Sequence, residues 1–323
     1  MAFGIGDFKF NKKKVAMAQN SKISWCNHTA NIWWGCTAVH EGCDNCYAEA
    51  LDNRYHHDNP HWGKSSSRLA VKSFWKDVAR FQRKAKEANE IHRVFVGSMM
   101  DIFEKPMPLV NTSGYKILHP DFATDTIDIA DEKLDSGYLR TIFFEQVIPK
   151  CPNLMFLLLT KRPHNINKYI PESWKESPPP NVMFGTSVVN QQTADKLIPQ
   201  LLSVNGRTFL SVEPMLAPID LKLPIPPNPH IMLDENREEN KMLSFFSRHD
   251  RYIDSVATYE FTRKPDWIIV GGESGGNKRP FDPDWARDIM RQCAEAFVPF
   301  FMKQIDGVKP IPEDLMVREF PKN

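Results

Sequence analysis

Seven short apolar runs recur along the chain, and each ends in polar residues or glycine. They occupy residues 32–36, 94–98, 154–160, 182–187, 208–213, 267–272 and 299–303. Within a run the apolar character is nearly continuous, which is typical of parallel strands that are buried on both faces. Stretches with a helical pattern lie between the runs, at residues 71–88, 192–202 and 284–296. The pattern therefore predicts an α/β fold in which parallel strands alternate with helices.

The spacing of the runs predicts a partial (β/α) TIM-like barrel of about six or seven parallel strands. One strand and its helix take about 30 residues, and the later units fit that length. Three intervals are roughly twice as long as one such unit, so we expect insertions near residues 50–92, 104–150 and 222–265. The barrel would span residues 21–309, between an N-terminal extension (1–20) and a C-terminal tail (310–323). A flat doubly wound sheet is the alternative architecture.

Composition narrows the class of protein without changing this fold. The 323 residues include 41 Lys and Arg against 40 Asp and Glu, which gives a net charge of +1. That balance excludes a protein that holds nucleic acid mainly by bulk positive charge, though not one with a local basic groove. The sequence has neither a signal-peptide core nor an apolar run of about 18 residues. We therefore expect a cytoplasmic protein that does not contact the membrane and whose six cysteines are reduced.

Polar side chains follow every predicted strand. In parallel α/β barrels the chemistry gathers where the strands end, at their carboxyl edge. One such residue alone would be an ordinary solvated loop residue, but the recurrence in phase with the strands predicts a polar pocket over one mouth of the barrel. These residues include Cys36, Ser98, Asp101, Lys161, Arg162, Glu213, Glu273 and Lys303.

Three cysteines share the loop after the first predicted strand. Cys36, Cys43 and Cys46 form a C-x6-C-x2-C triplet. Structural zinc is held by four ligands, whereas a cubane iron–sulfur cluster held by three cysteines keeps one iron free for a small molecule. The triplet therefore favours a cluster. The alternative is a zinc-stabilised nucleic-acid-binding protein without catalysis, with His40 or, less favourably, Cys26 as the fourth ligand.

Further motifs accompany this triplet along most of the chain. They include Trp34-Gly-Cys36, Val94-Phe-Val-Gly-Ser-Met-Met-Asp101, Leu159-Thr-Lys-Arg-Pro163, Ser211-Val-Glu-Pro-Met215 and Asp266-Trp-Ile-Ile-Val-Gly-Gly-Glu-Ser-Gly275. As a set, these motifs resemble a family of uncharacterised phage and bacterial proteins that is similar to radical S-adenosylmethionine (SAM) enzymes. The resemblance covers roughly residues 21–306. One departure is the spacing of the first two cysteines, because the commonest radical SAM signature has fewer residues between them than the six found here.

The resemblance implies a 4Fe-4S cluster on Cys36, Cys43 and Cys46, with SAM bound at its open iron. Reductive cleavage of SAM would give a 5′-deoxyadenosyl radical that abstracts a hydrogen from the substrate. Each charged residue of the pocket has an alternative role in a structural salt bridge over the barrel. The expected SAM-binding residues are Tyr47, Ser98, Asp101, Lys161 and Arg162, and the expected catalytic residues are Lys161, Glu213 and Glu273.

Two further features bear on the substrate. One face of a predicted helix is basic and carries Lys72, Lys76, Arg80, Arg83 and Lys84. This face is either a solvated surface or a contact for a phosphate backbone. Aromatic and histidine residues near the triplet either stack a flipped-out base or shield the cluster from water. Because the family occurs in phages, we expect a radical isomerase that acts in the host cytoplasm on an amino-acid-decorated thymine of phage DNA or on its nucleoside, with an electron donor such as flavodoxin.

Overall fold

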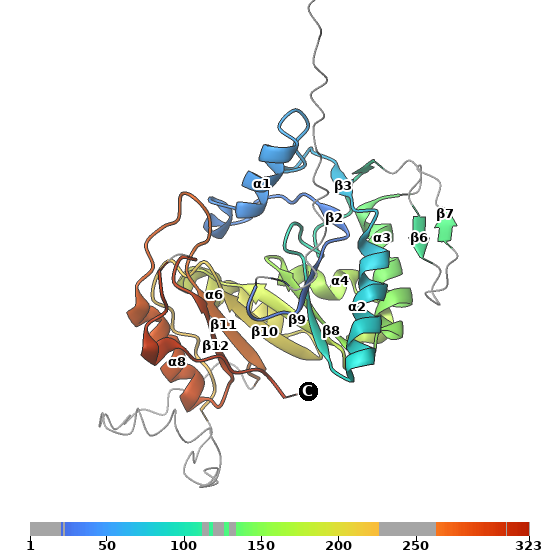
Figure 1. The fold of residues 1–323 in the computed structure, drawn as a ribbon. Coiled ribbons are helices and arrows are strands. Elements are labelled where there is room, and N and C mark those ends of the chain that lie inside the picture. The colour runs from blue at the N-terminus through green and yellow to red at the C-terminus, as the bar shows by residue number, and fades with distance from the viewer. Residues whose placement is uncertain are drawn as a thin grey trace, which may run out of the picture.

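A curled sheet of seven parallel strands forms the centre of the computed structural model (Figure 1). The structure describes residues 21, 23–111, 116–118, 126–128, 134–225, 263–307 and 309–322. The expected N-terminal extension and most of the third insertion therefore lie outside the described residues. The strand order is β1-β4-β8-β9-β10-β11-β12, and helices flank the sheet, so the protein is a half-barrel. This confirms the predicted partial TIM-like barrel.

The strands of the half-barrel are β1 (His28–Ala30), β4 (His92–Val96), β8 (Leu154–Thr160), β9 (Val182–Ser187), β10 (Arg207–Val212), β11 (Trp267–Gly271) and β12 (Phe300–Gln304). A second sheet holds β2 (Trp33–Trp34), β3 (Arg68–Ala70) and β5 (Leu109–Val110), and a third holds β6 (Lys116–Leu118) and β7 (Thr126–Asp128). The helices are α1 (Tyr47–Tyr55), α2 (Phe74–Ala88), α3 (Ser136–Ile142), α4 (Ile166–Tyr169), α5 (Glu172–Glu176), α6 (Gln191–Leu202) and α8 (Pro283–Glu295).

Both faces of the half-barrel sheet are buried, which explains why the apolar runs do not alternate. Val94 and Val96 belong to the large core cluster that includes the apolar sides of α2, α3, α6 and α8. Phe95, which points the other way between them, belongs to a smaller cluster on the inner face with Trp25 and Trp267. Successive side chains of a strand point to opposite faces, so each run supplies both clusters.

The predicted helices at residues 71–88, 192–202 and 284–296 are confirmed as α2, α6 and α8. Local capping accounts for two of these starts. The Asn190 side chain accepts a hydrogen bond from the backbone of Thr193 and forms a capping box with it at the start of α6. Asp282 caps α8, whose first residue is Pro283. These signals lie within a few residues of the helix they start, so the sequence alone contains them.

The prediction that residues 32–36 form the first strand of the barrel is wrong. The first strand of the half-barrel is β1, which pairs with β4, whereas the run at residues 32–36 leaves the sheet and supplies β2, antiparallel to β3. Asn31 explains the departure. Its amide donates to Ser98 Oγ at 2.8 Å, and its side-chain oxygen accepts from the Met99 backbone N–H at 2.8 Å. These bonds tie the chain to the end of β4, and β1 stops one residue earlier.

The interval between β1 and β4 holds a crossover helix and an inserted segment. Helix α2 packs on β1, β4 and β8 and is the crossover. Before it come β2, the loop with the three cysteines, α1 and β3. Figure 1 shows α1 set apart from the layer of helices that flanks the sheet. The cysteines are therefore carried by an insertion and not by a barrel helix.

The C-terminal residues cover the amino end of the half-barrel. The Met302 backbone N–H donates to Val317 O at 2.9 Å, and the Trp267 indole donates to Glu319 O at 2.9 Å. Phe320 packs on the rings of Trp267 and Phe301. Because Trp267 is the first residue of β11, this segment lies at the end of the sheet opposite to the strand carboxyl ends. None of the described helices is both long and apolar enough to cross a membrane.

Candidate functional site

A cavity of about 370 Å³ lies at the carboxyl edge of the half-barrel, between the strand ends and the cysteine-bearing loop. Its volume falls in the range of small-molecule sites. Residues predicted for the site from five separate parts of the chain meet there. The lining includes all ten of them: Cys36, Cys43, Cys46, Tyr47, Ser98, Asp101, Lys161, Arg162, Glu213 and Glu273.

The three cysteines of the loop are free thiols that are partly exposed. Burial, with a further contribution from Asp101, raises the pKa of Cys36 to about 12, while Arg162 acts to lower it. Burial also raises the pKa of Cys46, against the backbone N–H groups at the start of α1 and the Lys161 ammonium. A helix N-terminus and nearby cations stabilise a thiolate, but burial outweighs them here, so a metal that binds these cysteines has to displace their protons.

Asp101 and Arg162 brace the loop from the ends of β4 and β8. Arg162 Nη1 donates to Asp101 Oδ2 at 2.6 Å, and Arg162 Nη2 donates to Thr37 O at 2.5 Å. Asp101 Oδ1 also accepts from the Thr160 hydroxyl at 2.6 Å. Arg162 Nη1 lies 3.7 Å from Cys36 Sγ. Both side chains are buried and bonded to the loop or to each other. They therefore hold the loop in place.

Glu273 and Arg279 hold the loop from the other side of the cavity. Arg279 Nη2 donates to Glu273 Oε1 at 2.6 Å and to Glu41 O at 3.0 Å. The amide of Asn45 donates to Glu273 Oε2 at 3.1 Å. Burial acts to raise the pKa of Glu273, but the bonds from Arg279 and Asn45 prevail and hold it below its ordinary value. The buried Glu273 carboxylate therefore ties the end of β11 to the cysteine loop.

The remaining charged residues face the cavity with fewer constraints. Glu213, after β10, forms an ion pair with Lys303 of β12, and each side chain is 15% exposed. Within the part of the chain that the structure describes, the Lys161 ammonium has no hydrogen bond or ion pair, although its backbone N–H donates to Asp101 Oδ2 at 3.1 Å. Lys161 and the Glu213–Lys303 pair are therefore the charges that a ligand can engage.

Tyr47 and Ser98 meet at the mouth of the cavity. The Tyr47 hydroxyl donates to Ser98 O at 2.7 Å, and the tyrosine ring is 43% exposed. Gly97, just before Ser98, has a φ of +110°, a conformation that side-chain-bearing residues rarely adopt. The contact links the start of α1 to the end of β4. It leaves the tyrosine ring free to cover a ligand.

Some residues of this site were not predicted, and not every aromatic residue near the cysteine triplet faces the cavity. Asn45 and Arg279 were not expected to act together, because 234 positions separate them and no local pattern marks the contact. Trp33 is fully buried in the large core cluster, whereas Trp62 lines the cavity. The basic face of α2 lies on the helix-covered side of the sheet, where Arg80 pairs with Asp77 at 2.5 Å.

The fold and the site define a half-barrel α/β protein with a cysteine-lined cavity at the carboxyl edge of its strands. The chain belongs to the family described as "Protein of unknown function (DUF5131)", which matches residues 20–115 and 115–316. No curated protein and no solved structure matches the chain. The family description assigns no activity, so the chemistry of the site carries the functional argument.

Proposed function

We propose that this protein is a radical SAM enzyme that binds a 4Fe-4S cluster through Cys36, Cys43 and Cys46, with SAM in the adjoining cavity. The observation that carries the proposal is that three free thiols on one loop and the charged ends of parallel strands line the same cavity. When bound and reduced, such a cluster supplies the electron that cleaves SAM to methionine and a 5′-deoxyadenosyl radical.

The donor set fits a cluster better than a single zinc ion. Zinc–sulfur bonds are about 2.3 Å long, so two sulfurs on one zinc ion are at most about 4.6 Å apart. Among the described residues, the group of possible ligands whose atoms all lie within 4.8 Å of one another is Asp52, His56 and His61, and it contains no cysteine. His40 Nδ1 accepts from the Gly42 backbone N–H at 3.1 Å, while its Nε2 atom is buried without a hydrogen-bond partner and is the atom that the zinc alternative would use. A larger centre suits the spacing of the thiols.

The chain's own residues divide into supports and ligand contacts. Arg162 and Asp101 keep the loop against β8, and Glu273 keeps it against β11. Lys161, with no carboxylate partner among the described residues, binds the carboxylate of SAM. Tyr47 covers the mouth of the cavity beside Ser98. The Glu213 carboxylate, which accepts a hydrogen bond from Lys303, orients the substrate.

We also propose that the substrate is a thymine nucleoside decorated with an amino acid, either free or in phage DNA, and that the reaction is an isomerisation. Glu213 and Lys303 offer one negative and one positive group side by side, which matches the ammonium and carboxylate of an amino acid. Because Glu213 and Lys303 lie inside the cavity, a base in DNA would have to be flipped out to reach them. On this proposal the protein works in the host cytoplasm with a donor such as flavodoxin.

Anaerobic purification tests the proposal. The brown protein should contain four irons per chain and should form 5′-deoxyadenosine from SAM only when a reductant is added. Cys43→Ala should abolish both properties, because two thiolates do not hold the cluster. The matched control is Cys151→Ala, since Cys151 is a buried cysteine of the core, and it should retain both.

Two outcomes separate the parts of this proposal. A colourless protein with one zinc ion on the cysteines would overturn the enzyme proposal and favour the zinc-stabilised nucleic-acid-binding protein. Cleavage of SAM without any change in amino-acid-decorated thymidine, tested both as nucleoside and in DNA, would overturn the substrate and leave the cluster intact.

A further inference from the structure

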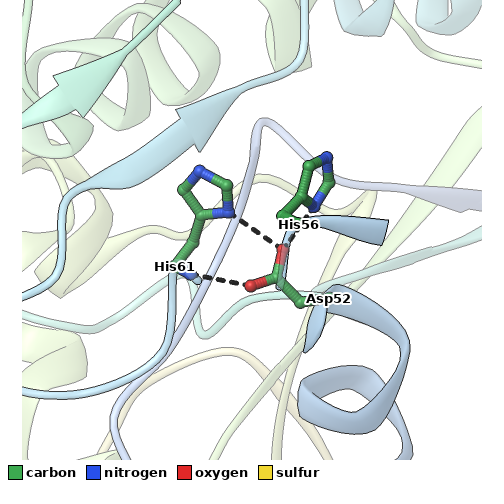
Figure 2. A group of neighbouring side chains, drawn as sticks. All are labelled: Asp52, His56 and His61. Carbon is green, nitrogen blue, oxygen red and sulfur yellow. Dashed lines mark hydrogen bonds and ion pairs between the residues drawn. The ribbon is translucent and has the colours of Figure 1, made fainter. Parts of the chain in front are cut away.

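A second group of possible metal ligands lies outside the lining of the cavity. Asp52, His56 and His61 come together where α1 ends and the chain turns toward β3 (Figure 2). Asp52 is fully buried, the His61 side chain is 4% exposed and the His56 side chain is 31% exposed. Two imidazoles and one carboxylate are the ligands that zinc and similar first-row divalent ions take in proteins.

The two histidines approach the same carboxylate oxygen. The Nδ1 atoms of His56 and His61 lie 2.8 Å and 2.9 Å from Asp52 Oδ1. Ligands bound to one ion at about 2.1 Å and at right angles to each other are about 3 Å apart. Each nitrogen is therefore already spaced from the carboxylate oxygen as a neighbouring ligand would be, and the two nitrogens lie within 4.8 Å of each other. A bound ion requires each neutral ring to carry its single proton on Nε2 in place of Nδ1, with no net loss of protons.

The other contacts of the group keep it in place. Asp52 Oδ2 accepts from the His61 backbone N–H at 2.7 Å, so the carboxylate stays oriented whichever atom carries the imidazole protons. The fully buried Arg68 donates to His61 O at 2.8 Å and forms a two-bond pair with Glu104, at 2.8 and 2.9 Å. Buried charges paired in this way fix the backbone on which His61 stands.

The position of the group relates it to the cysteine loop. Helix α1 begins directly after Cys46, and its last turn carries Asp52 and leads into His56. On the other side, the Gly63 backbone N–H donates to Cys36 O at 2.9 Å. The segment that carries the three cysteines is thus joined at both ends to this group. An ion here would lock the two ends together.

We propose that Asp52 Oδ1, His56 Nδ1 and His61 Nδ1 bind a divalent transition metal ion, of the zinc class, that braces the segment carrying the cysteines. The site is separate from the cluster and does not depend on the proposed SAM chemistry. Three protein ligands leave at least one position for water, which the partly exposed His56 side allows. The ion's role is structural, because none of its three ligands lines the cavity.

Titration of the metal-free full-length chain with Zn²⁺ and Co²⁺ tests this site. We expect one ion per chain bound by nitrogen and oxygen, seen with Co²⁺ as weak visible bands separate from the intense near-ultraviolet bands of cobalt thiolates. His56→Ala should remove that one equivalent. His57→Ala is the matched control, because His57 is 77% exposed and pairs with the exposed Asp58, and it should bind as the wild type does.

Thermal melting provides the second readout. Zinc at about a hundredfold excess over its dissociation constant should raise the midpoint of the wild type and of His57→Ala by roughly 5 °C or more, and should leave that of His56→Ala unchanged. Equal midpoints of the metal-free proteins show that the variant folds. The proposal is overturned if His56→Ala binds as many ions as the wild type, or if all bound Co²⁺ shows thiolate bands. It is also overturned if the bound ion is lost in Cys46→Ser and not in His56→Ala.

Discussion

The charged residues at the cavity differ in whether their hydrogen-bonding atoms already have partners within the protein. Asp101, Arg162 and Glu273 were expected at the site as groups that bind SAM or act on the substrate, yet each has its hydrogen-bonding atoms taken by the fold. Lys161 and the Glu213–Lys303 pair keep theirs toward the cavity. Residue type and position at a strand end were enough to predict which residues line the cavity. Which of them support the loop and which can contact a ligand depends on their hydrogen-bond partners in the folded protein.

The pKa of His28 also depends on its neighbours in the folded protein, and it gives a prediction for the stability. Its Nε2 lies 3.0 Å from His92 Nδ1, and His92 Nε2 lies 3.0 Å from Glu90. If His92 donates to Glu90, then His28 donates to His92, and His28 Nδ1 is buried without a partner. Burial lowers the pKa of His28 from 6.5 to about 4, and the positive charges of Lys84 and Arg80 add to the effect.

Because the pKa is lower in the folded state, the unfolded chain binds the proton first as the pH falls. The stability from neutral His28 is complete above about pH 6.5 and is lost as the pH falls toward 4, by about 3 kcal/mol. In urea unfolding at pH 7 and pH 4, His28→Leu should show a decrease smaller than the wild type's by about this amount. Equal decreases in the two proteins would show that His28 does not contribute.

Among the elements, those with local signals were predictable. Helices α6 and α8 carry their caps in the sequence, and the strands β8 to β12 follow from apolar runs buried on both faces. Strand β1 was missed because Asn31 makes its deciding bonds to Ser98 and Met99, far along the chain. The cysteine triplet was visible as a pattern, whereas the contacts that hold its loop join elements that no spacing rule relates.

The clamp between β11 and the cysteine loop gives a prediction at this scale. Arg279→Ala removes the bonds to Glu273 and Glu41 and leaves a buried carboxylate without its cation, at a cost of about 1–3 kcal/mol. We expect iron content after anaerobic reconstitution to fall several-fold, with the fold retained by circular dichroism. Arg287→Ala is the control, since Arg287 pairs with Asp284 and Asp314 at the surface. Iron content in Arg279→Ala equal to that of this control would contradict the clamp.

The whole molecule is a half-barrel that is covered at one end by the C-terminal segment and carries its cavity at the other. The alternation of runs and helices was enough to predict the barrel. It was not enough to predict how residues 317–320 pack. They lie along the edge of β12 and bring Phe320 against Trp267 and Phe301, although this segment shows neither a strand nor a helix pattern in the sequence. The cover also explains how the inner aromatic cluster stays dry although the barrel does not close.

Removing residues 317–323 tests the role of this cover. The truncation exposes the rings of Trp267 and Phe301 and removes the bond from the Trp267 indole to Glu319 O. We expect a loss of about 2–4 kcal/mol in urea unfolding and a red shift of tryptophan emission. Removing residues 322 and 323 alone, which deletes the bond from Arg207 to Lys322 O, should have a much smaller effect on both. Unchanged stability in the longer truncation would mean that the segment does not seal the core.

The hydrogen bonds that hold the cysteine loop also determine when during synthesis the loop can take its final shape. Cys36 and Thr37 are held by Arg162, and Asn45 is held by Glu273, which lies 228 positions further along the chain. During synthesis the thiols therefore leave the ribosome long before the residues that arrange them. Iron and sulfide offered to a half-made chain would meet an unbraced loop. On the proposed function, loading of the cluster thus belongs after release of the chain, and cells that produce this protein quickly should accumulate a folded form without the cluster.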